Sequence, residues 1–395
     1  MPPSVAGRFR SPSAFDPGFN PAQANARVAI LAPLTGANSE RGQALVQAAQ
    51  LALSAPGSPP LDVKDTGGTA DGAGAAAAQA VAAGAGLIIG PLTGAETAAA
   101  AGPARRAGVP MLAFTNDTAQ AQPGVWTLGI TPAQQVRRLV VASAAEGRGR
   151  FAALLPQNAF GTAMASALTQ ATNAAGVPPP TIRRYGSGMA AMNGAVRDLS
   201  GYTDRRAPVD ADLKAARAQR DEDGRRANPD ATPRDVPPPP FDTLLLADIG
   251  DPLAQITALL PYYDITQPTV RVLGPILWAA PAARGGADLT GARYAAPDPA
   301  ARAPFSQAFQ AKYGSPAPGL ADVAYDAASI ARVLAQSGGF SPPSLTRPDG
   351  YAGVDGVLAL NPDGSVRRGL AIFEIQRGGP VVVQPAPDTI SAPGT

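Results

Sequence analysis

The chain has 395 residues, and 32 Lys and Arg side chains against 30 Asp and Glu give it a formal net charge of +2. This near balance provides no basic face for nucleic acid, and the length predicts more than one domain or lobe. The sequence contains no cysteine and no histidine, which excludes disulfides, thiolate metal sites, a cysteine nucleophile and a Ser-His-Asp triad. We therefore expect a protein that is not an enzyme and that holds neither a metal nor another cofactor.

The first 26 residues are rich in proline and polar residues, and they predict a flexible tether. They lack the basic and apolar regions of a signal peptide, and no run in the chain has the length of a membrane span. Either the protein is cytoplasmic or its export segment is missing from this sequence. A proline-rich tail of the kind that links a membrane anchor to a domain favours the second alternative.

From residue 27 onward, short apolar runs alternate with helical patterns. The runs that predict strands lie at 27–32, 61–65, 87–89, 109–114, 125–130, 151–155, 181–185, 243–247 and 270–274. The helical patterns lie at about 40–54, 71–83, 94–107, 162–175, 194–199, 251–260, 304–313 and 320–335, and Thr131-Pro132-Ala133-Gln134 has the spacing that begins a further helix. Such alternation is typical of parallel sheets covered by helices.

Residues 87–114 show most clearly how one of these strand–helix–strand units begins and ends. Thr93 and Glu96 have the spacing of a capping box, so the helix should start directly after the strand. We expect it to bend or restart at Gly102-Pro103 and to close at Gly108. The turn between strand and helix opens at the carboxyl edge of the sheet, where ligands of open α/β sheets bind.

Two later stretches break this rhythm. Residues 201–240 carry eight basic and eight acidic side chains and almost no large apolar ones, which indicates a solvated insertion, partly helical near 210–223. An arm that docks a partner is the alternative. Toward the C-terminus, turn residues at 361–364 and 377–379 separate alternating strands and predict antiparallel hairpins.

A pattern of aromatic and small residues in segment 305–327 resembles a signature of the type I periplasmic solute-binding proteins, the leucine/isoleucine/valine-binding class. The pattern consists of Phe305, Phe309, Tyr313-Gly314, Pro316 and Ala324-Tyr325-Asp326-Ala327. The segments 32–36 and 89–93 match as well. The resemblance covers about residues 27–387. It implies an α/β fold of two Rossmann-like lobes with mainly parallel sheets, a central cleft and antiparallel C-terminal hairpins. Lobe 1 is expected at 27–130 plus 276–345, lobe 2 at 131–275 plus 346–387, and a tail at 388–395.

A narrower resemblance rests on the charged insertion and on five short segments at 259–264, 295–298, 353–356, 361–364 and 368–371. These look like the penicillin-binding protein activator branch of the same superfamily. That branch implies outer-membrane lipoproteins of the periplasm that stimulate peptidoglycan synthases by protein contact. The lipid-bearing cysteine is absent from this sequence, so any anchor would lie on a residue outside it.

The resemblance also implies where a ligand would bind. The candidate residues for the cleft are Thr35, Gly36, Thr93, Gly94, Ala95, Thr115, Asn116, Asp117, Phe160, Asp248 and Tyr325. The turn that should offer serine hydroxyls to a carboxylate reads Thr93-Gly94-Ala95, and Asp117 would repel a carboxylate. Asp248 is the plausible partner for an ammonium group.

Each candidate also has a structural interpretation. Thr93 can serve only as a helix cap, Asn116 and Asp117 can be ordinary turn residues, and Tyr325 can pack between the lobes. The weakened carboxylate site favours a non-enzymatic regulator of peptidoglycan synthesis that binds a synthase. The alternative is a receptor that delivers an amino acid, amide or other small solute to an ABC permease.

Overall fold

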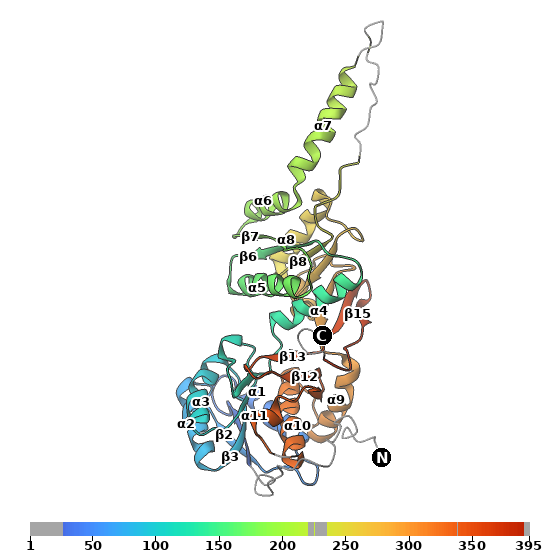
Figure 1. Cartoon of the computed structure of the whole chain (residues 1–395). Helices are drawn as coiled ribbons and strands as arrows, with labels where there is room; N and C mark the ends of the chain where they lie inside the picture. The colour runs from blue at the N-terminus through green and yellow to red at the C-terminus, as the bar shows by residue number, and fades with distance from the viewer. Residues whose placement is uncertain (1–26, 220–224, 226–234, 338, 391–395) are drawn as a thin grey trace. The chain divides into compact units, whose positions relative to one another are not determined.

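The computed structural model describes residues 27–219, 225, 235–337 and 339–390 of the chain (Figure 1). They form two compact units. Unit 1 contains the segment ending at Gln134, Pro297–Ala371 and the segment from Pro385, and unit 2 contains Gln135–Ala296 and Ile372–Gln384. The expected tether at 1–26 and residues 391–395 of the expected tail lie outside the described residues.

Unit 1 contains a parallel sheet of five strands in the order β2-β1-β3-β4-β5. The strands are β1 (Arg27–Ala32), β2 (Leu61–Asp65), β3 (Ala85–Ile89), β4 (Met111–Ala113) and β5 (Val125–Thr127). The helices of unit 1 are α1 (Ser39–Ala52), α2 (Ala70–Ala82), α3 (Gly94–Arg106), α9 (Pro299–Tyr313), α10 (Ala321–Ser337) and α11 (Pro342–Leu345), with a 3₁₀ turn η2 (Thr118–Gln120).

Strand β1 shows why this sheet is buried on both faces. Val28 and Ile30 pack in a cluster with α1 and α10, whereas Ala29 and Leu31 pack in a second cluster with α2 and α3. Successive side chains of a strand point to opposite faces, so an uninterrupted apolar run needs a helical layer on each side. The buried residues of α2 are alanines, and α3 adds Ala100, Ala101 and Ala104 to the same cluster; such small side chains allow close approach.

Unit 2 contains a seven-stranded sheet in the order β15-β14-β10-β9-β8-β6-β7. Its strands are β6 (Phe151–Pro156), β7 (Thr181–Tyr185), β8 (Thr243–Leu246), β9 (Arg271–Gly274), β10 (Arg293–Ala296), β14 (Ala371–Gln376) and β15 (Gly379–Gln384). The pairs from β10 to β7 are parallel, and β14 and β15 form an antiparallel hairpin. The helices are α4 (Pro132–Ala145), α5 (Ala159–Ala174), α6 (Met189–Ser200), α7 (Tyr202–Ala218) and α8 (Gly250–Leu259), with 3₁₀ turns η3 (Leu260–Tyr263), η4 (Ile276–Ala279) and η5 (Pro281–Arg284).

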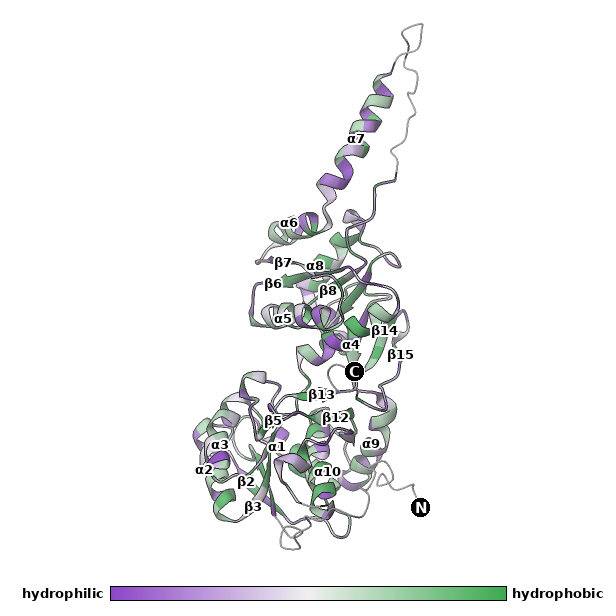
Figure 2. Cartoon of the chain, viewed as in Figure 1, coloured by the Kyte–Doolittle hydropathy of each residue, from purple (hydrophilic) through white to green (hydrophobic). Residues whose placement is uncertain are grey.

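Helix α7 extends away from the sheet of unit 2 and carries hydrophilic residues along its length (Figure 2). Val209 is its one buried residue. The base of the helix is anchored by Arg205, which donates hydrogen bonds to the carbonyls of Ser200 (2.8 Å) and Tyr263 (3.0 Å) and to the Asp264 carboxylate (3.1 Å). The rings of Tyr202 and Tyr263 meet edge to face beside it. The helix therefore has a fixed base and a solvated body.

A three-stranded antiparallel sheet of β11 (Tyr351–Gly353), β12 (Gly356–Leu360) and β13 (Val366–Arg368) completes unit 1. The expected turn at 361–364 joins β12 to β13, and the Asn361 N–H donates to the Ser365 carbonyl (2.9 Å). Leu358, Leu360 and Val366 belong to the same apolar cluster as β1 and α10.

The fold class is confirmed: two units with mostly parallel sheets and antiparallel hairpins toward the C-terminus. The boundaries differ from the expected ones in two places. Strand β10 pairs with β9, which brings residues 276–296 into unit 2. Strands β11–β13 pack on the core of unit 1, so residues 346–371 belong there.

Two expected helices also differ from the structure. Of the expected bend or restart at Gly102-Pro103, the restart does not occur, because α3 is one helix through Pro103; Gly102 has no Cβ to clash with the proline ring. In the insertion, the helix spans Tyr202–Ala218 instead of the expected 210–223, since its base is anchored at Tyr202 and Arg205. Residues 220–224 and 226–234 lie outside the described part. No described helix is long and apolar enough to cross a membrane.

Candidate functional site

The carboxyl edge of the five-stranded sheet in unit 1 brings together three of the turns predicted to bind a ligand. Thr35 and Gly36 follow β1, Thr93–Ala95 follow β3, and Thr115–Asp117 follow β4. Strands β1, β3 and β4 are consecutive neighbours in this sheet. The parallel order thus groups residues that are far apart in the sequence, and the side chains of each turn show what it can bind.

The turn after β1 is held by Asp65, at the end of β2. The Thr35 hydroxyl donates to Asp65 Oδ2 (2.7 Å), and the backbone N–H groups of Leu34 and Gly67 donate to Oδ1 (both 2.8 Å). Burial alone would raise the pKa of Asp65, but these hydrogen bonds stabilise the carboxylate and lower it below its usual value. The proton of the Thr35 hydroxyl is therefore already used within the protein.

The turn after β3 is a complete capping box. The Thr93 hydroxyl donates to Glu96 Oε2 (2.7 Å) and accepts from the Glu96 N–H (3.3 Å). The other oxygen of Glu96 accepts from the Thr66 hydroxyl (2.6 Å), and Glu96 is buried. Thr93 thus caps α3, as the sequence predicted, and its hydroxyl has no proton left to donate to a ligand.

The turn after β4 places a carboxylate against the first turn of α3. A Cβ built on Gly94 would lie 2.4 Å from Asp117 Oδ2, so the Asp117 side chain is in direct contact with the Gly94 backbone. The same carboxylate accepts from the Ala119 N–H (3.1 Å) and from the Gln120 side-chain amide (3.0 Å). Because the N-terminus of a helix attracts anions, the protein's own Asp117 lies where a ligand carboxylate would bind.

The neighbours of Asp117 have structural roles. The Asp117 N–H donates to the Thr115 hydroxyl oxygen (3.0 Å), and Thr115 is buried. The backbone of Asn116 lies against Gly129, where an added Cβ would be 2.6 Å from the Asn116 nitrogen. These contacts fit the interpretation of the turn as tightly packed local structure.

Tyr325 lies on α10 inside the apolar core of unit 1. Only 6% of its surface is exposed, and its ring centroid lies 4.6 Å from that of Phe305. It therefore packs within the core of unit 1.

Next to Tyr325, unit 1 contains a group of buried charges that the sequence did not reveal. Its members are the buried residues Asp322, Asp326, Asp355 and Arg368 and the half-buried Arg302, and we call this group the buried charge cluster. Arg302 binds Asp322 with two nitrogens, Nε at 2.6 Å and Nη2 at 3.0 Å. Arg368 lies 3.5 Å from Asp326 and 3.8 Å from Asp355, and it donates to the Leu128 carbonyl (2.9 Å).

Three carboxyl groups face two guanidinium groups in this cluster. Burial and the nearby Asp355 raise the pKa of Asp326, and burial likewise raises the pKa of Asp322. One proton shared among the carboxyls would make the cluster neutral. No group of three or more acidic side chains in the described ranges has an arrangement that could hold a metal ion.

In unit 2, Asp248 follows β8 at the carboxyl edge of the seven-stranded sheet. Its carboxylate accepts a short hydrogen bond from the Tyr185 hydroxyl, and its carbonyl accepts from the Trp278 indole N–H (2.9 Å). Burial and the Asp248 carboxylate raise the pKa of Tyr185 above its usual range. Phe160 lies in the first turn of α5, which is capped by the Asn158 side chain on the Gly161 N–H (2.8 Å).

The comparisons with known proteins identify the family. The model of the family described as "Periplasmic binding protein" matches residues 25–380. The chain belongs to this family. A search of the curated proteins finds no significant match.

Solved structures with the same fold fall into two groups. A Rhodospirillum rubrum protein described as a branched-chain amino acid ABC transporter is similar at TM-score 0.68 and 21% identity, over 91% of this chain and 100% of that one. The C-domain of LpoA from Haemophilus influenzae, described as a regulator of PBP1A, is similar at TM-score 0.62 and 18% identity, over 91% of this chain and all of that domain. The chain covers 60% of full-length LpoA. At these identities the likeness shows a shared fold.

Proposed function

We propose that this protein is a non-enzymatic periplasmic regulator of peptidoglycan synthesis that acts by contact with a synthase. The observation that carries the proposal is the position of Asp117, whose carboxylate contacts Gly94 at the N-terminus of α3. An amino acid receptor needs hydroxyl and N–H donors at such a turn for the ligand carboxylate. Here the donors of Thr35 and Thr93 are used internally and a negative charge stands beside them.

The comparisons support this proposal through the LpoA C-domain, which has the same fold and is described as a regulator of PBP1A. Membership of the periplasmic binding protein family fits a location in the periplasm. We also propose that a lipid on a residue outside this sequence tethers the protein to a membrane, as the resemblance to the activator branch implies.

A second function, a receptor for a small solute, is favoured by the surface around Asp248. Met189, Ile249 and Leu277 follow β7, β8 and β9 at one edge of the sheet, and between 43% and 49% of each is exposed. Apolar side chains around a carboxylate suit a solute with an apolar body and an ammonium group. Such a solute would be delivered to an ABC permease.

One experiment separates the two functions. Thermal unfolding is followed with leucine and with 2-phenylethylamine at millimolar concentration, and binding to a peptidoglycan synthase of the same organism is measured by biolayer interferometry. A regulator binds the synthase and shows no thermal shift with either compound. A receptor gains several degrees, because a ligand at 100 times its Kd stabilises the folded state by about 2.7 kcal/mol. A shift with leucine contradicts the argument from Asp117.

A further inference from the structure

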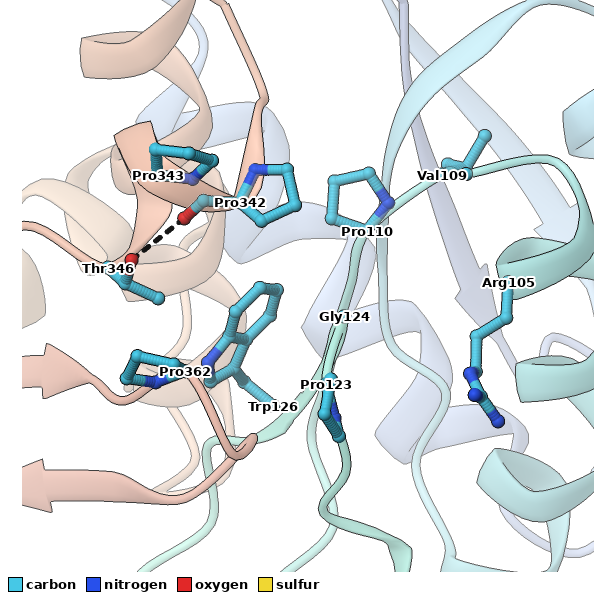
Figure 3. A pocket seen from close by; sticks show the side chains of 11 residues that line it. Arg105, Val109, Pro110, Pro123, Gly124, Trp126, Pro342, Pro343, Thr346 and Pro362 are labelled. Atoms are coloured by element: carbon cyan, nitrogen blue, oxygen red, sulfur yellow. Dashed lines mark hydrogen bonds between the residues drawn. The ribbon is translucent and has the colours of Figure 1, made fainter.

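A second concave surface lies on unit 1 at the amino ends of β4 and β5, which is the sheet edge opposite the candidate site. Five prolines line it: Pro110, Pro123, Pro342, Pro343 and Pro362. It is an open depression of about 500 Å³, and we call it the proline groove. Figure 3 shows Pro342, Pro343 and Pro362 on one wall, Pro110 and Val109 across from them, and Trp126 between the two walls.

The groove is rigid. The Trp126 indole N–H donates to the Asn361 carbonyl (2.7 Å), and Trp126 is fully buried beneath the rim. A Cβ on Gly364 would lie 2.3 Å from the Gln122 nitrogen, so the turn that carries Pro362 is packed directly on the turn that carries Pro123. The proline rings themselves lose no side-chain entropy on binding. A ligand would therefore meet a preorganised surface.

The chemistry of the lining restricts what it can bind. Proline has no N–H, and the Thr346 hydroxyl already donates to the Pro342 carbonyl (2.9 Å). Of the described lining residues, Arg105 alone is charged. It is exposed at the rim, and one of its nitrogens donates to the Gln122 side chain (2.7 Å). A guanidinium has five N–H donors and binds carboxylates well.

We propose that the proline groove docks a segment of a protein partner in which an aromatic side chain stands next to a carboxylate. Flat aromatic rings pack well against proline rings. Grooves lined by aromatic residues bind proline-rich peptides in this way, and here the prolines line the groove and the aromatic ring belongs to the ligand. The carboxylate pairs with Arg105. A protein segment fits better than a free small molecule, because Pro123, Pro342, Pro343 and Pro362 are exposed and leave the groove too open to enclose a small ligand.

The probe is the capped tetrapeptide Gly-Phe-Glu-Gly, compared with capped Gly-Phe-Gln-Gly, capped Gly-Ala-Glu-Gly and free 3-phenylpropionate. Binding to the full chain is measured by isothermal titration calorimetry, and the contacted amides are located by NMR. We expect the first peptide to bind and to shift the amides of residues 108–126 and 344–364. The glutamine peptide should bind about fivefold more weakly, as for an exposed ion pair. The alanine peptide should lose most of the binding.

Two variants of the protein sharpen the test. Arg105→Gln should lower the affinity for the glutamate peptide to that for the glutamine peptide. Arg105→Lys should keep much of the difference in affinity between the two peptides. The matched control is Arg106→Gln, since Arg106 is the next exposed arginine and does not line the groove. Absence of peptide binding, or binding indifferent to the glutamate or to Arg105, overturns the proposal. Free 3-phenylpropionate binding as tightly as the peptide also overturns it and indicates a small-molecule site. None of these outcomes depends on the proposed regulation of a synthase.

Discussion

Asp117 and Gly94 show how a single pair of residues changes the chemistry of a helix N-terminus. The carboxylate of Asp117 occupies the space in which any other residue at position 94 would place its Cβ, 2.4 Å from Oδ2. Glycine at 94 and aspartate at 117 are therefore coupled, and the negative charge stabilises the start of α3.

This coupling predicts opposite effects for two helical glycines, Gly94 in α3 and Gly194 in α6. Gly94→Ala should lower the free energy of unfolding by about 1–3 kcal/mol, because the added methyl group must displace Asp117. Gly194→Ala in α6, the control, should raise it by up to about 1 kcal/mol through helix propensity, since nothing lies within 4 Å of its added Cβ. Urea unfolding of each variant measures both changes. An equal effect at the two positions would contradict the assigned contact.

At the scale of elements, α7 depends on its base. The helix is polar around most of its circumference, so burial contributes little to its stability. The hydrogen bonds of Arg205 to Ser200, Tyr263 and Asp264 connect it to the rest of unit 2. A polar helix fixed at one end keeps its surface available to solvent or to a partner.

The loss of Arg205 should therefore loosen α7 without unfolding the sheet of unit 2. For Arg205→Ala we expect limited proteolysis within Tyr202–Ala218 to become at least about tenfold faster, which corresponds to about 1.4 kcal/mol. Arg206→Ala is the control, because its ion pair with Asp210 (3.4 Å) and its hydrogen bond to the Tyr202 hydroxyl (2.9 Å) both lie within α7 and do not connect the helix to the rest of unit 2. Equal cleavage of the two variants would show that Arg205 does not anchor the helix.

At the scale of the whole molecule, the buried charge cluster connects parts of unit 1 that are distant in the sequence. Arg302 lies on α9, Asp322 and Asp326 on α10, and Arg368 on β13. Asp355 adds a third carboxyl, and one of its oxygens has no hydrogen-bond partner among the described residues. Burial raises the pKa values of Asp322 and Asp326, and the nearby Asp355 carboxyl raises them further.

The cluster predicts that the stability of unit 1 depends on pH. Burial raises the pKa of Asp322 from 3.8 to about 8, so the folded state binds its proton more tightly than the unfolded state does. The contribution of the Asp322 proton to the free energy of unfolding is complete below about pH 4 and is lost as the pH rises through about 8. We expect a decrease of about 1–3 kcal/mol between pH 5 and pH 8, measured by urea unfolding.

The variant Asp355→Asn tests the cause. It removes the third negative charge, so it should flatten the pH profile and stabilise the protein at pH 8 relative to pH 5. The matched control is Asp349→Asn, because the Asp349 side chain is 77% exposed and pairs with Arg347 at the surface. A pH profile that Asp355→Asn leaves unchanged would refute the role of the cluster.

Much of the local structure was predictable because it depends on residues close in the sequence. The capping boxes of Thr93 with Glu96 and of Thr131 with Gln134 span three residues each, and both form in the structure. The apolar run of β1 predicts a strand buried on both faces, and the turn at 361–364 predicts a hairpin. The family resemblance added the arrangement in two units.

The candidate site depended on contacts between distant residues. The hydrogen bond of Thr35 to Asp65 spans 30 residues, and that of Tyr185 to Asp248 spans 63. Asp117 reaches Gly94 only because β3 and β4 are neighbours in the sheet. Asp65 could have been suspected from its place at the end of a predicted strand. Asp326, Asp355 and Arg368 lie in segments that carry the family resemblance, but nothing in the sequence indicated that they would meet in one buried charge cluster.

The sequence by itself thus determined the elements, their order and the absence of histidine and cysteine chemistry, because propensity, capping and composition are local properties. Tertiary structure alone decided which hydroxyl groups already donate to carboxylates of the protein, which carboxylate lies at the start of α3 and how five prolines from separate segments form one groove. These properties depend on which strands become neighbours, and burial of apolar faces over the whole unit determines that arrangement.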